Sequence, residues 1–229
     1  MIEKFLNQQL LQNLSMKTFL LALLLVSLHA SSQAFIEEIQ EFKRQDSIHF
    51  PAKKSNLFVG SSSFRLWQNI EQAFPDHKVT NRGFGGSSLP DVIRYANDII
   101  FPYKPKQIII YCGENDFAAS DTVSAQTVAN RFIQLFTMIR NQWKKMPVVF
   151  VSIKPSPSRE HLLPKVIEAN RLIREFLASQ KKTKYIDVFN LMLDAQGKPR
   201  KELFGPDMLH MNATGYAIWQ KELEPVLKD

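Results

Sequence analysis

Short apolar runs alternate along this chain with segments that have the spacing of amphipathic helices, and no other feature constrains the fold as strongly. The runs that predict strands are residues 56–60, 78–84, 107–113, 147–153 and 184–189. Two of them, QIIIYCG and PVVFVSI, are almost continuously apolar and rich in β-branched residues, which is typical of strands covered on both faces. Strands that alternate with helices in this way predict a parallel sheet.

The helical segments complete the predicted architecture. Residues 122–145 and 164–182 carry apolar residues at helical spacing, and residues 213–227 also predict a helix. Pro164 suits the first turn of its helix, and Asn212 is suited to cap the last one. Ahead of the first strand, the stretch FIEEIQEFKRQ is expected to form an amphipathic helix packed across the sheet. We therefore expect an α/β fold, a three-layer sandwich whose five-stranded parallel sheet has helices on both faces.

The N-terminal segment is expected to be a targeting signal and not part of this fold. In residues 16–34, MKTFLLALLLVSLHASSQA, a lysine precedes an apolar run that is shorter than the roughly 20 residues of a membrane span. Small residues then lead to a predicted cleavage site after Ala34. Residues 1–34 are thus expected to be an extension and signal peptide, with Met16 as an alternative start, and residues 35–229 a secreted or periplasmic domain. An uncleaved anchor is the competing interpretation, but after cleavage no stable membrane span is expected.

Composition excludes several other classes of protein. The 229 residues carry a formal net charge of +7, but lysine and arginine are scattered and form no basic stripe interleaved with aromatic residues, so nucleic acid is not an expected partner. Cys112 is the single cysteine, which excludes an internal disulfide, and its apolar neighbours predict a buried thiol. No cluster of histidines and carboxylates has the spacing of a metal site, so neither a metal nor a cofactor is expected.

The segments that follow the predicted strands are where a functional site is expected. In a parallel α/β sheet, ligands bind outside the carboxyl ends of the strands. In chain order these segments read GSSS, GFGGSS, GEND, KPSPSR and a long loop that ends in PDMLHMN. The sequence therefore predicts that the site is assembled from loops that are far apart in the chain.

Ser62 and His210 are the candidates for nucleophile and base. Ser62 lies directly between the first strand and a helix, where free backbone N–H groups and the helix dipole favour developing negative charge. Asp207 precedes His210 by three residues, so on a loop or short turn its carboxylate can accept from the ring Nδ1–H and leave Nε2 facing the serine. Two simpler alternatives remain, serines that only cap a helix and a surface pair of Asp207 and His210. If Ser62 and His210 react together, they must lie within hydrogen-bond reach at one rim of the sheet.

Gly86 and Asn115 are candidates for holding an oxyanion. Acyl transfer needs hydrogen-bond donors aimed at the negatively charged oxygen of the tetrahedral intermediate. A glycine allows its backbone N–H to approach closely, and an asparagine side chain supplies a second donor. The glycines of GFGGSS do not instead indicate a dinucleotide loop, because Ser88 stands where that motif has its last glycine.

The ordered set GSSS, NRGFGGS, GEND and PDMLH resembles blocks I, II, III and V of the SGNH (GDSL-type) hydrolases, each after the appropriate strand. The resemblance extends from about residue 56 to the C-terminus. It implies the flavodoxin-like fold of that family, with Ser62 as nucleophile, His210 as base and Asp207 orienting it. It also implies that the N–H groups of Ser62 and Gly86 and the side-chain amide of Asn115 form the oxyanion hole.

The resemblance implies a serine esterase or acylhydrolase that acts through an acyl-enzyme. Expected substrates are short acyl or acetyl esters of carbohydrate, or lysophospholipid. One position departs from the family pattern, since Ser61 stands where the family usually has aspartate. Two alternatives stay open: an acyltransferase that uses the same residues, and a non-catalytic carbohydrate-binding member of the family.

Other side chains near the motifs are interpreted from their expected surroundings alone. Aromatic and basic residues that could line a substrate pocket are Trp67, Phe84, Phe117 and Arg65. For Trp67 and Phe84, core packing is the favoured interpretation. The acidic residues on either side of Asn115 are expected to form hydrogen bonds within the loop, and these are Glu114 and Asp116.

Overall fold

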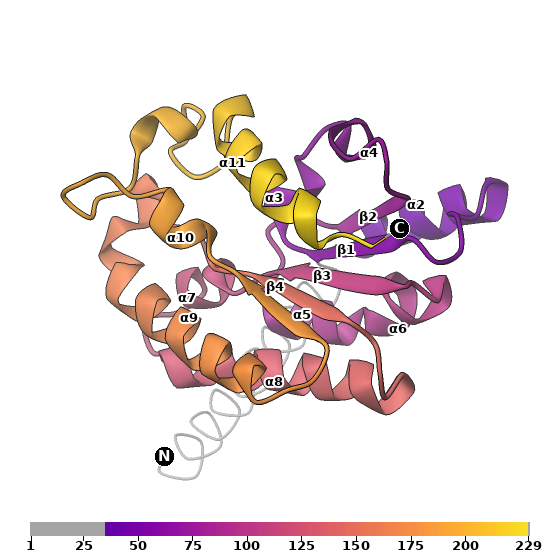
Figure 1. Ribbon diagram of the computed structural model, residues 1–229. Coiled ribbons are helices and arrows are strands. Elements are labelled where there is room, and N and C mark those ends of the chain that lie inside the picture. The colour runs from indigo at the N-terminus through magenta and orange to yellow at the C-terminus, as the bar shows by residue number, and fades with distance from the viewer. Residues whose placement is uncertain (1–34, 229) are drawn as a thin grey trace, which may run out of the picture. The chain divides into compact units, whose positions relative to one another are not determined.

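The computed structural model describes residues 35–228, and its central feature is a five-stranded sheet in which all neighbouring strands are parallel (Figure 1). The strands are β1 (Asn56–Gly60), β2 (Val79–Gly83), β3 (Gln107–Tyr111), β4 (Val148–Val151) and β5 (Thr183–Ile186). Their order in the sheet is β2-β1-β3-β4-β5, the order of flavodoxin-like doubly wound folds. The predicted α/β fold with a parallel sheet is therefore confirmed.

The chain divides into two compact units, Met1–Glu37 and Glu38–Asp229. Of the first unit the structure describes only residues 35–37, so the predicted extension, signal peptide and cleavage after Ala34 lie outside the described residues and stay predictions. The sheet and the site described below belong to the second unit. No helix within residues 35–228 combines the length and the apolar character that crossing a membrane requires.

Helices flank the sheet on both faces. The α-helices are α2 (Ile36–Ile48), α3 (Ser62–Arg65), α4 (Ile70–Ala73), α5 (Leu89–Arg94), α6 (Ala96–Ile99), α7 (Glu114–Ala118), α8 (Ala125–Gln142), α9 (Leu163–Ala178), α10 (Val188–Leu191) and α11 (Ala213–Leu223). Short 3₁₀ segments are Phe101–Tyr103, Pro157–Leu162, Lys201–Leu203 and Glu224–Val226. Pro164 lies in the first turn of α9, and the side chain of Asn212 accepts hydrogen bonds from Thr214 N and Gly215 N at the start of α11, as predicted.

The sheet buries side chains on both faces, because successive side chains along each strand point alternately toward the two helical layers. On one face, Phe58 and Ile109 belong to a core that includes Trp219 of α11, whose ring packs 4.7 Å from that of Tyr111. On the other face, Phe150 of β4 packs against Phe132 of α8, with ring centroids 4.7 Å apart. Figure 1 shows α3, α4, α10 and α11 above the sheet, and α5, α6, α8 and α9 below it. All residues of β3 and β4 are buried, as their apolar sequences predict.

The predicted N-terminal helix forms, but its position differs from the one predicted. Only Ile39 of α2 is buried, and the helix contacts the edge strand β2 instead of packing across the sheet. Asp46 accepts hydrogen bonds from Arg82 Nη2 and from Tyr103 OH, both at 2.5 Å. Arg82 also lies over the Phe42 ring at 4.9 Å. Charged contacts attach this helix because its sequence offers few apolar side chains to bury.

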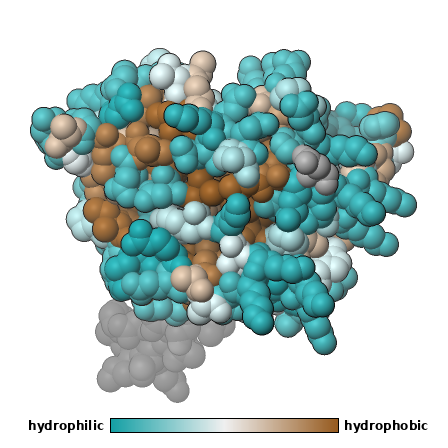
Figure 2. All heavy atoms as spheres, in the orientation of Figure 1, coloured by the Kyte–Doolittle hydropathy of each residue, from teal (hydrophilic) through white to brown (hydrophobic). Residues whose placement is uncertain are grey.

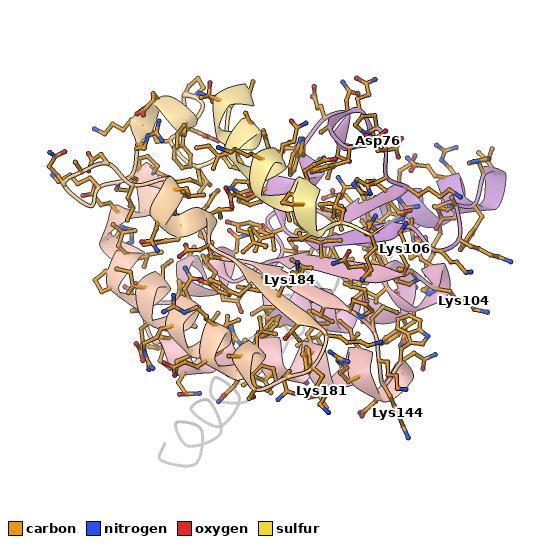
Figure 3. All side chains as sticks on the ribbon, viewed as in Figure 1. Asp76, Lys104, Lys106, Lys144, Lys181 and Lys184 are labelled. Carbon is orange, nitrogen blue, oxygen red and sulfur yellow. The ribbon has the colours of Figure 1, made fainter. Side chains whose placement is uncertain are left out.

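Polar residues cover most of the surface that is in view. Figure 2 shows a largely hydrophilic face on which apolar residues form an interrupted band near α10 and α11. The lysines Lys104, Lys144 and Lys181 are exposed (Figure 3). Lys144 and Lys181 lie near each other, because the guanidinium group of Arg140 donates to the backbone carbonyl groups of both.

The carboxyl end of β1 lies at the point where the chain reverses its direction across the sheet. From β1 the chain goes to β2 on one side, and then to β3 and β4 on the other, so the loops after β1 and β3 diverge at a switch point. Gly60 ends β1 with a φ of +136°, and a Cβ there would lie 1.9 Å from the Tyr111 carbonyl oxygen. Ser61 N donates to that same oxygen at 3.0 Å. Glycine therefore allows the β1 loop to turn close against β3.

Replacing Gly60 with alanine should destabilise the protein strongly, because the new methyl group meets backbone atoms that cannot move aside. We expect Gly60→Ala to lower the free energy of unfolding by about 3 kcal/mol or more. Gly197→Ala is the matched control, since Gly197 also has a positive φ, +74°, but no atom within 4 Å of its added Cβ. For Gly197→Ala the expected loss in the free energy of unfolding is about 1 kcal/mol. Denaturant unfolding measures both, and equal losses would contradict the close approach of β1 to β3.

Candidate active site

Ser62 is the first residue of α3, directly beyond the end of β1. Ser61 occupies the N-cap position in extended conformation, and the turn places Ser62 at the edge of the sheet with its side chain partly exposed. The backbone N–H of Ser62 has no acceptor among the described residues. The β1–α3 turn therefore presents a hydroxyl and an unused N–H donor side by side.

His210 and Asp207 lie together on the loop before α11. His210 Nδ1 is 2.6 Å from Asp207 Oδ2, and His210 Nε2 is 3.0 Å from Ser62 Oγ. A carboxylate beside Nδ1 favours the tautomer with the proton on that nitrogen, which leaves Nε2 to accept from the serine hydroxyl. The structure thus brings together the three residues that the sequence predicts, in one hydrogen-bonded chain.

The loop holds the carboxylate of Asp207 in its ionised form. Burial alone would raise the pKa of Asp207, but the backbone N–H groups of His210 and Leu209 and the His210 ring outweigh it and lower the pKa to about 2. Both N–H groups donate to Oδ1, at 2.9 Å from His210 and 3.0 Å from Leu209, while Oδ2 faces the ring. One oxygen therefore fixes the carboxylate to the backbone, and the other is left to orient the imidazole.

Asn115 and Gly86 lie next to each other at the start of α7 and in the loop after β2. A Cβ built on Gly86 would lie 3.8 Å from Asn115 Nδ2, and the Gly86 N–H has no acceptor among the described residues. Asn115 Nδ2 donates to Ser61 Oγ at 3.0 Å and to Ser87 O at 3.1 Å. Because Ser61 adjoins Ser62, these contacts place the Asn115 amide beside the β1–α3 turn that carries Ser62.

The departure from the family pattern at Ser61 has a local explanation. Ser61 is buried, with 4% of its surface exposed, and its hydroxyl accepts from the Asn115 amide nitrogen. A hydroxyl oxygen can accept this hydrogen bond as an aspartate would, without placing a further buried charge beside Asn115. Ser61 therefore links the β1–α3 turn to Asn115.

A buried ion pair behind Asn115 was not recognised from the sequence. Lys154, one of the residues that follow β4, is 1% exposed, and its Nζ donates to Glu114 Oε2 and to Ser156 Oγ, both at 2.6 Å. Tyr111 OH also donates to Glu114 Oε2, at 3.1 Å. Burial raises the pKa of Glu114, but the charges of Lys154 and Arg159 outweigh it, so the pKa is lowered. The signal that could have found this pair is a lysine directly after an apolar strand, since buried lysines require a partner.

Arg159 was also missed, although its motif KPSPSR was noted. Its Nη1 donates to Asn115 Oδ1 at 2.9 Å and lies 3.6 Å from Glu114 Oε1. Arg159 belongs to the Pro157–Leu162 segment and interrupts its helical geometry with φ −123° and ψ 27°. This places a guanidinium group in direct contact with a predicted oxyanion-hole residue.

The remaining residues singled out from the sequence belong to the scaffold. Asp116 is fully buried, accepts from Leu89 N at 2.9 Å and pairs with Arg131 at 2.8 Å, so it joins α5, α7 and α8 as a loop-bonding residue. Burial raises the pKa of Asp116 and that of the core thiol Cys112. The aromatic candidates for a pocket are all buried in the core: Trp67, Phe84 and Phe117.

Arg65 does not line the site either. It is exposed and forms an ion pair with Glu38 at 2.6 Å. Within residues 35–228, no three histidine, cysteine, aspartate or glutamate side chains are grouped so that they could hold a metal ion. The described site offers a hydroxyl, an imidazole, a carboxylate and several N–H donors.

The sequence matches the model of the GDSL-like Lipase/Acylhydrolase family over residues 54–218. That span is more than half of the chain, and the protein belongs to this hydrolase family. The family predicted from the four ordered motifs is thereby confirmed. No curated protein sequence matches the chain.

Several solved structures share the fold. A Streptococcus pneumoniae protein whose description names platelet activating factor superposes with a TM-score of 0.74 at 20% identity, over 90% of this chain and 99% of that one. A GDSL-like lipase from Bacteroides thetaiotaomicron gives 0.70 at 17% identity, over 82% and 96%. A family 3 carbohydrate esterase from Clostridium thermocellum gives 0.57 at 14% identity, over 76% and 97%. At these identities the similarity establishes the fold alone.

Removing Lys154 should destabilise the protein, because it leaves the buried charge of Glu114 without its closest partner. We expect Lys154→Met to lower the free energy of unfolding by about 3–5 kcal/mol. The double variant Glu114→Gln/Lys154→Met should recover part of this loss, and Lys144→Met, at an exposed lysine, should change it little. Denaturant unfolding of the four proteins tests this. An unchanged free energy of unfolding in Lys154→Met would mean that the Lys154–Glu114 pair is not buried in solution.

Lys154→Met should also reverse the pH dependence of the stability that Glu114 contributes. In the wild type, the lowered pKa of Glu114 contributes stability that is present above its ordinary value of 4.5 and is lost as the pH falls through the lowered pKa. Without Lys154, burial is the largest remaining influence and raises the pKa of Glu114, so stability should decrease as the pH rises above 4.5. The two slopes can be compared by unfolding between about pH 2 and about pH 8, a range that covers the wild-type loss below pH 4.5 and the loss expected in the variant above it.

Proposed function

We propose that the protein is a serine esterase that hydrolyses carboxylic esters of short acyl groups through an acyl-enzyme intermediate. The observation that carries this proposal is the continuous chain Asp207–His210–Ser62, with contacts of 2.6 Å and 3.0 Å, beside unused backbone N–H donors. A serine that only capped its helix would need no imidazole beside its Oγ. An Asp–His pair that was only a surface pair would not place its ring within hydrogen-bond distance of a serine hydroxyl. Membership of a hydrolase family supports the same conclusion.

The proposed reaction has two steps that use the same residues. Ser62 Oγ attacks the ester carbonyl carbon while His210 Nε2 takes the hydroxyl proton, and Asp207 stabilises the imidazolium that forms. His210 then donates this proton to the leaving alcohol, and the acyl group remains on Ser62. In the second step His210 takes a proton from water, whose oxygen attacks the acyl carbon. The acid leaves, and the proton returns to Ser62.

The oxyanion of each tetrahedral intermediate is proposed to be held by three donors. The N–H groups of Ser62 and Gly86 have no acceptor within the described residues, so both can point at an incoming oxygen. Asn115 Nδ2 already donates to Ser61 and Ser87, and we propose that the hydrogen directed at Ser61 is shared with the oxyanion in a three-centre bond. Such a donor is held in place before the substrate arrives, which lowers the cost of stabilising the charge.

Short acyl chains are favoured over long ones by the surroundings of the site. The aromatic side chains nearest the motifs pack in the core and are not placed along a channel. The His210 side chain is 30% exposed and that of Asp207 is 51% exposed, so bulk solvent lies close to the reacting groups. We therefore propose short acyl or acetyl esters of carbohydrate as the substrate class, as in the carbohydrate esterase that shares this fold, with lysophospholipid as the competing class.

Ser62→Ala should abolish hydrolysis of a short-chain nitrophenyl ester and labelling by a fluorophosphonate probe. Loss of the nucleophile should lower kcat by about 10⁶-fold while the fold is kept. Ser124→Ala is the control, because it removes another serine at a helix start, the cap of α8, which lies outside the site. Retained turnover in Ser62→Ala would exclude Ser62 as the nucleophile. A wild-type protein that is never labelled would favour the non-catalytic alternative.

Asp207→Asn should be less damaging than His210→Ala. In serine hydrolases the orienting carboxylate contributes about 10⁴-fold to kcat and the base about 10⁶-fold. Because Asp207 is half exposed, water can replace part of its role, and we expect a loss below about 10⁴-fold. Since the pKa of Asp207 is about 2, its ionisation should not appear in the rate profile above about pH 4. Equal losses in the two variants would contradict a purely orienting role.

A further inference from the structure

Arg159 contacts the one predicted oxyanion donor that is a side chain. Its Nη1 donates to Asn115 Oδ1 at 2.9 Å, and its side chain is 20% exposed. Ser87 O, an acceptor, faces Asn115 Nδ2 at 3.1 Å. A guanidinium can only donate and a carbonyl can only accept, so these two contacts determine which end of the amide is oxygen and which is nitrogen. The plane and the orientation of the Asn115 amide are thereby fixed from both ends.

Two cationic side chains, Lys154 and Arg159, share the buried carboxylate of Glu114. Lys154 Nζ, 2.6 Å from Glu114 Oε2, neutralises that carboxylate. Glu114 Oε1 has no hydrogen-bond partner among the described residues, and Arg159 lies 3.6 Å from it. Arg159 therefore has a hydrogen bond to Asn115 on one side and an ionic contact with the buried Glu114 carboxylate on the other.

We propose that Arg159 is a positioning residue of the oxyanion hole, acting through Asn115, and that the buried Lys154–Glu114 pair keeps it in place. This inference rests on the proposed esterase function. A positive donor on the amide oxygen draws electron density from the amide nitrogen, so its N–H becomes a stronger donor toward an oxyanion. That effect grows as the substrate oxygen gains charge, so it acts on the transition state more than on the bound ester.

The test is the kinetics of Arg159→Gln and Arg159→Lys with a neutral short-chain nitrophenyl ester. For Arg159→Gln we expect kcat to fall about 10- to 100-fold with KM changed less than about twofold, because an interaction made mainly in the transition state is lost. Arg159→Lys keeps the charge but not the planar fork, and its kcat should lie between those of Arg159→Gln and the wild type. Arg171→Gln, at an exposed arginine that pairs with Glu168 and Glu175 on α9, should match the wild type.

A double variant separates action through Asn115 from direct action on the substrate. If Arg159 works through Asn115, then Arg159→Gln should lower kcat little further in an Asn115→Ala background. Three results would overturn the inference: an unchanged kcat in Arg159→Gln, full additivity of the two substitutions, or a rise in KM alone, which would make Arg159 a substrate-binding residue. The proposed function fails separately, if Ser62→Ala retains turnover or the wild type shows none, and the inference then fails with it. Matching near-ultraviolet circular dichroism spectra show that the variants are folded.

Discussion

The hydrogen bond between Ser62 Oγ and His210 Nε2 joins residues 148 positions apart, and the rest of the site depends on it. On one side, Gly60 lets β1 end in close contact with β3. The β1–α3 turn that carries Ser62 therefore begins beside the segment after β3 that carries Asn115. On the other side, the His210 loop is closed by its own backbone, with Gly205 N donating to His210 O at 2.8 Å. Both halves of the site are therefore held by backbone contacts.

The segment after β4 supports both halves of this arrangement. Ser158 N and Ser158 Oγ each donate to the Met208 carbonyl at 2.9 Å, which ties the segment to the loop that carries His210. The next residue, Arg159, donates to Asn115 Oδ1 at 2.9 Å. A single short stretch of chain thus connects the base to the proposed oxyanion hole. Loops that hold functional groups need such fixing, since a displacement of about 1 Å can cost about 100-fold in rate.

The buried charges at this edge of the sheet are difficult to explain by stability alone. A buried ion pair such as Lys154–Glu114 often contributes no more than well-packed apolar residues of similar volume would. Unlike apolar residues, this ion pair carries charge. It also places the Glu114 carboxylate where Arg159 can be held next to Asn115. Asp116, by contrast, is fully buried and serves the scaffold, because it joins the start of α5 to α8 through Leu89 N and Arg131. The two acidic residues that flank Asn115 therefore have different roles.

The sequence by itself determined the sheet and the family, because apolar periodicity and motif order can be read along the chain, and it singled out the candidate site residues Ser62, Gly86, Asn115, Asp207 and His210. It also indicated Pro164 in the first turn of α9 and the cap of α11 at Asn212. It could not place α2 beside β2, since that position depends on Arg82 and Asp46, which are far apart in sequence. Nor could it assign Lys154, Arg159 and Ser61. Their roles follow from burial and from which neighbour satisfies each polar group, and only tertiary structure decides both.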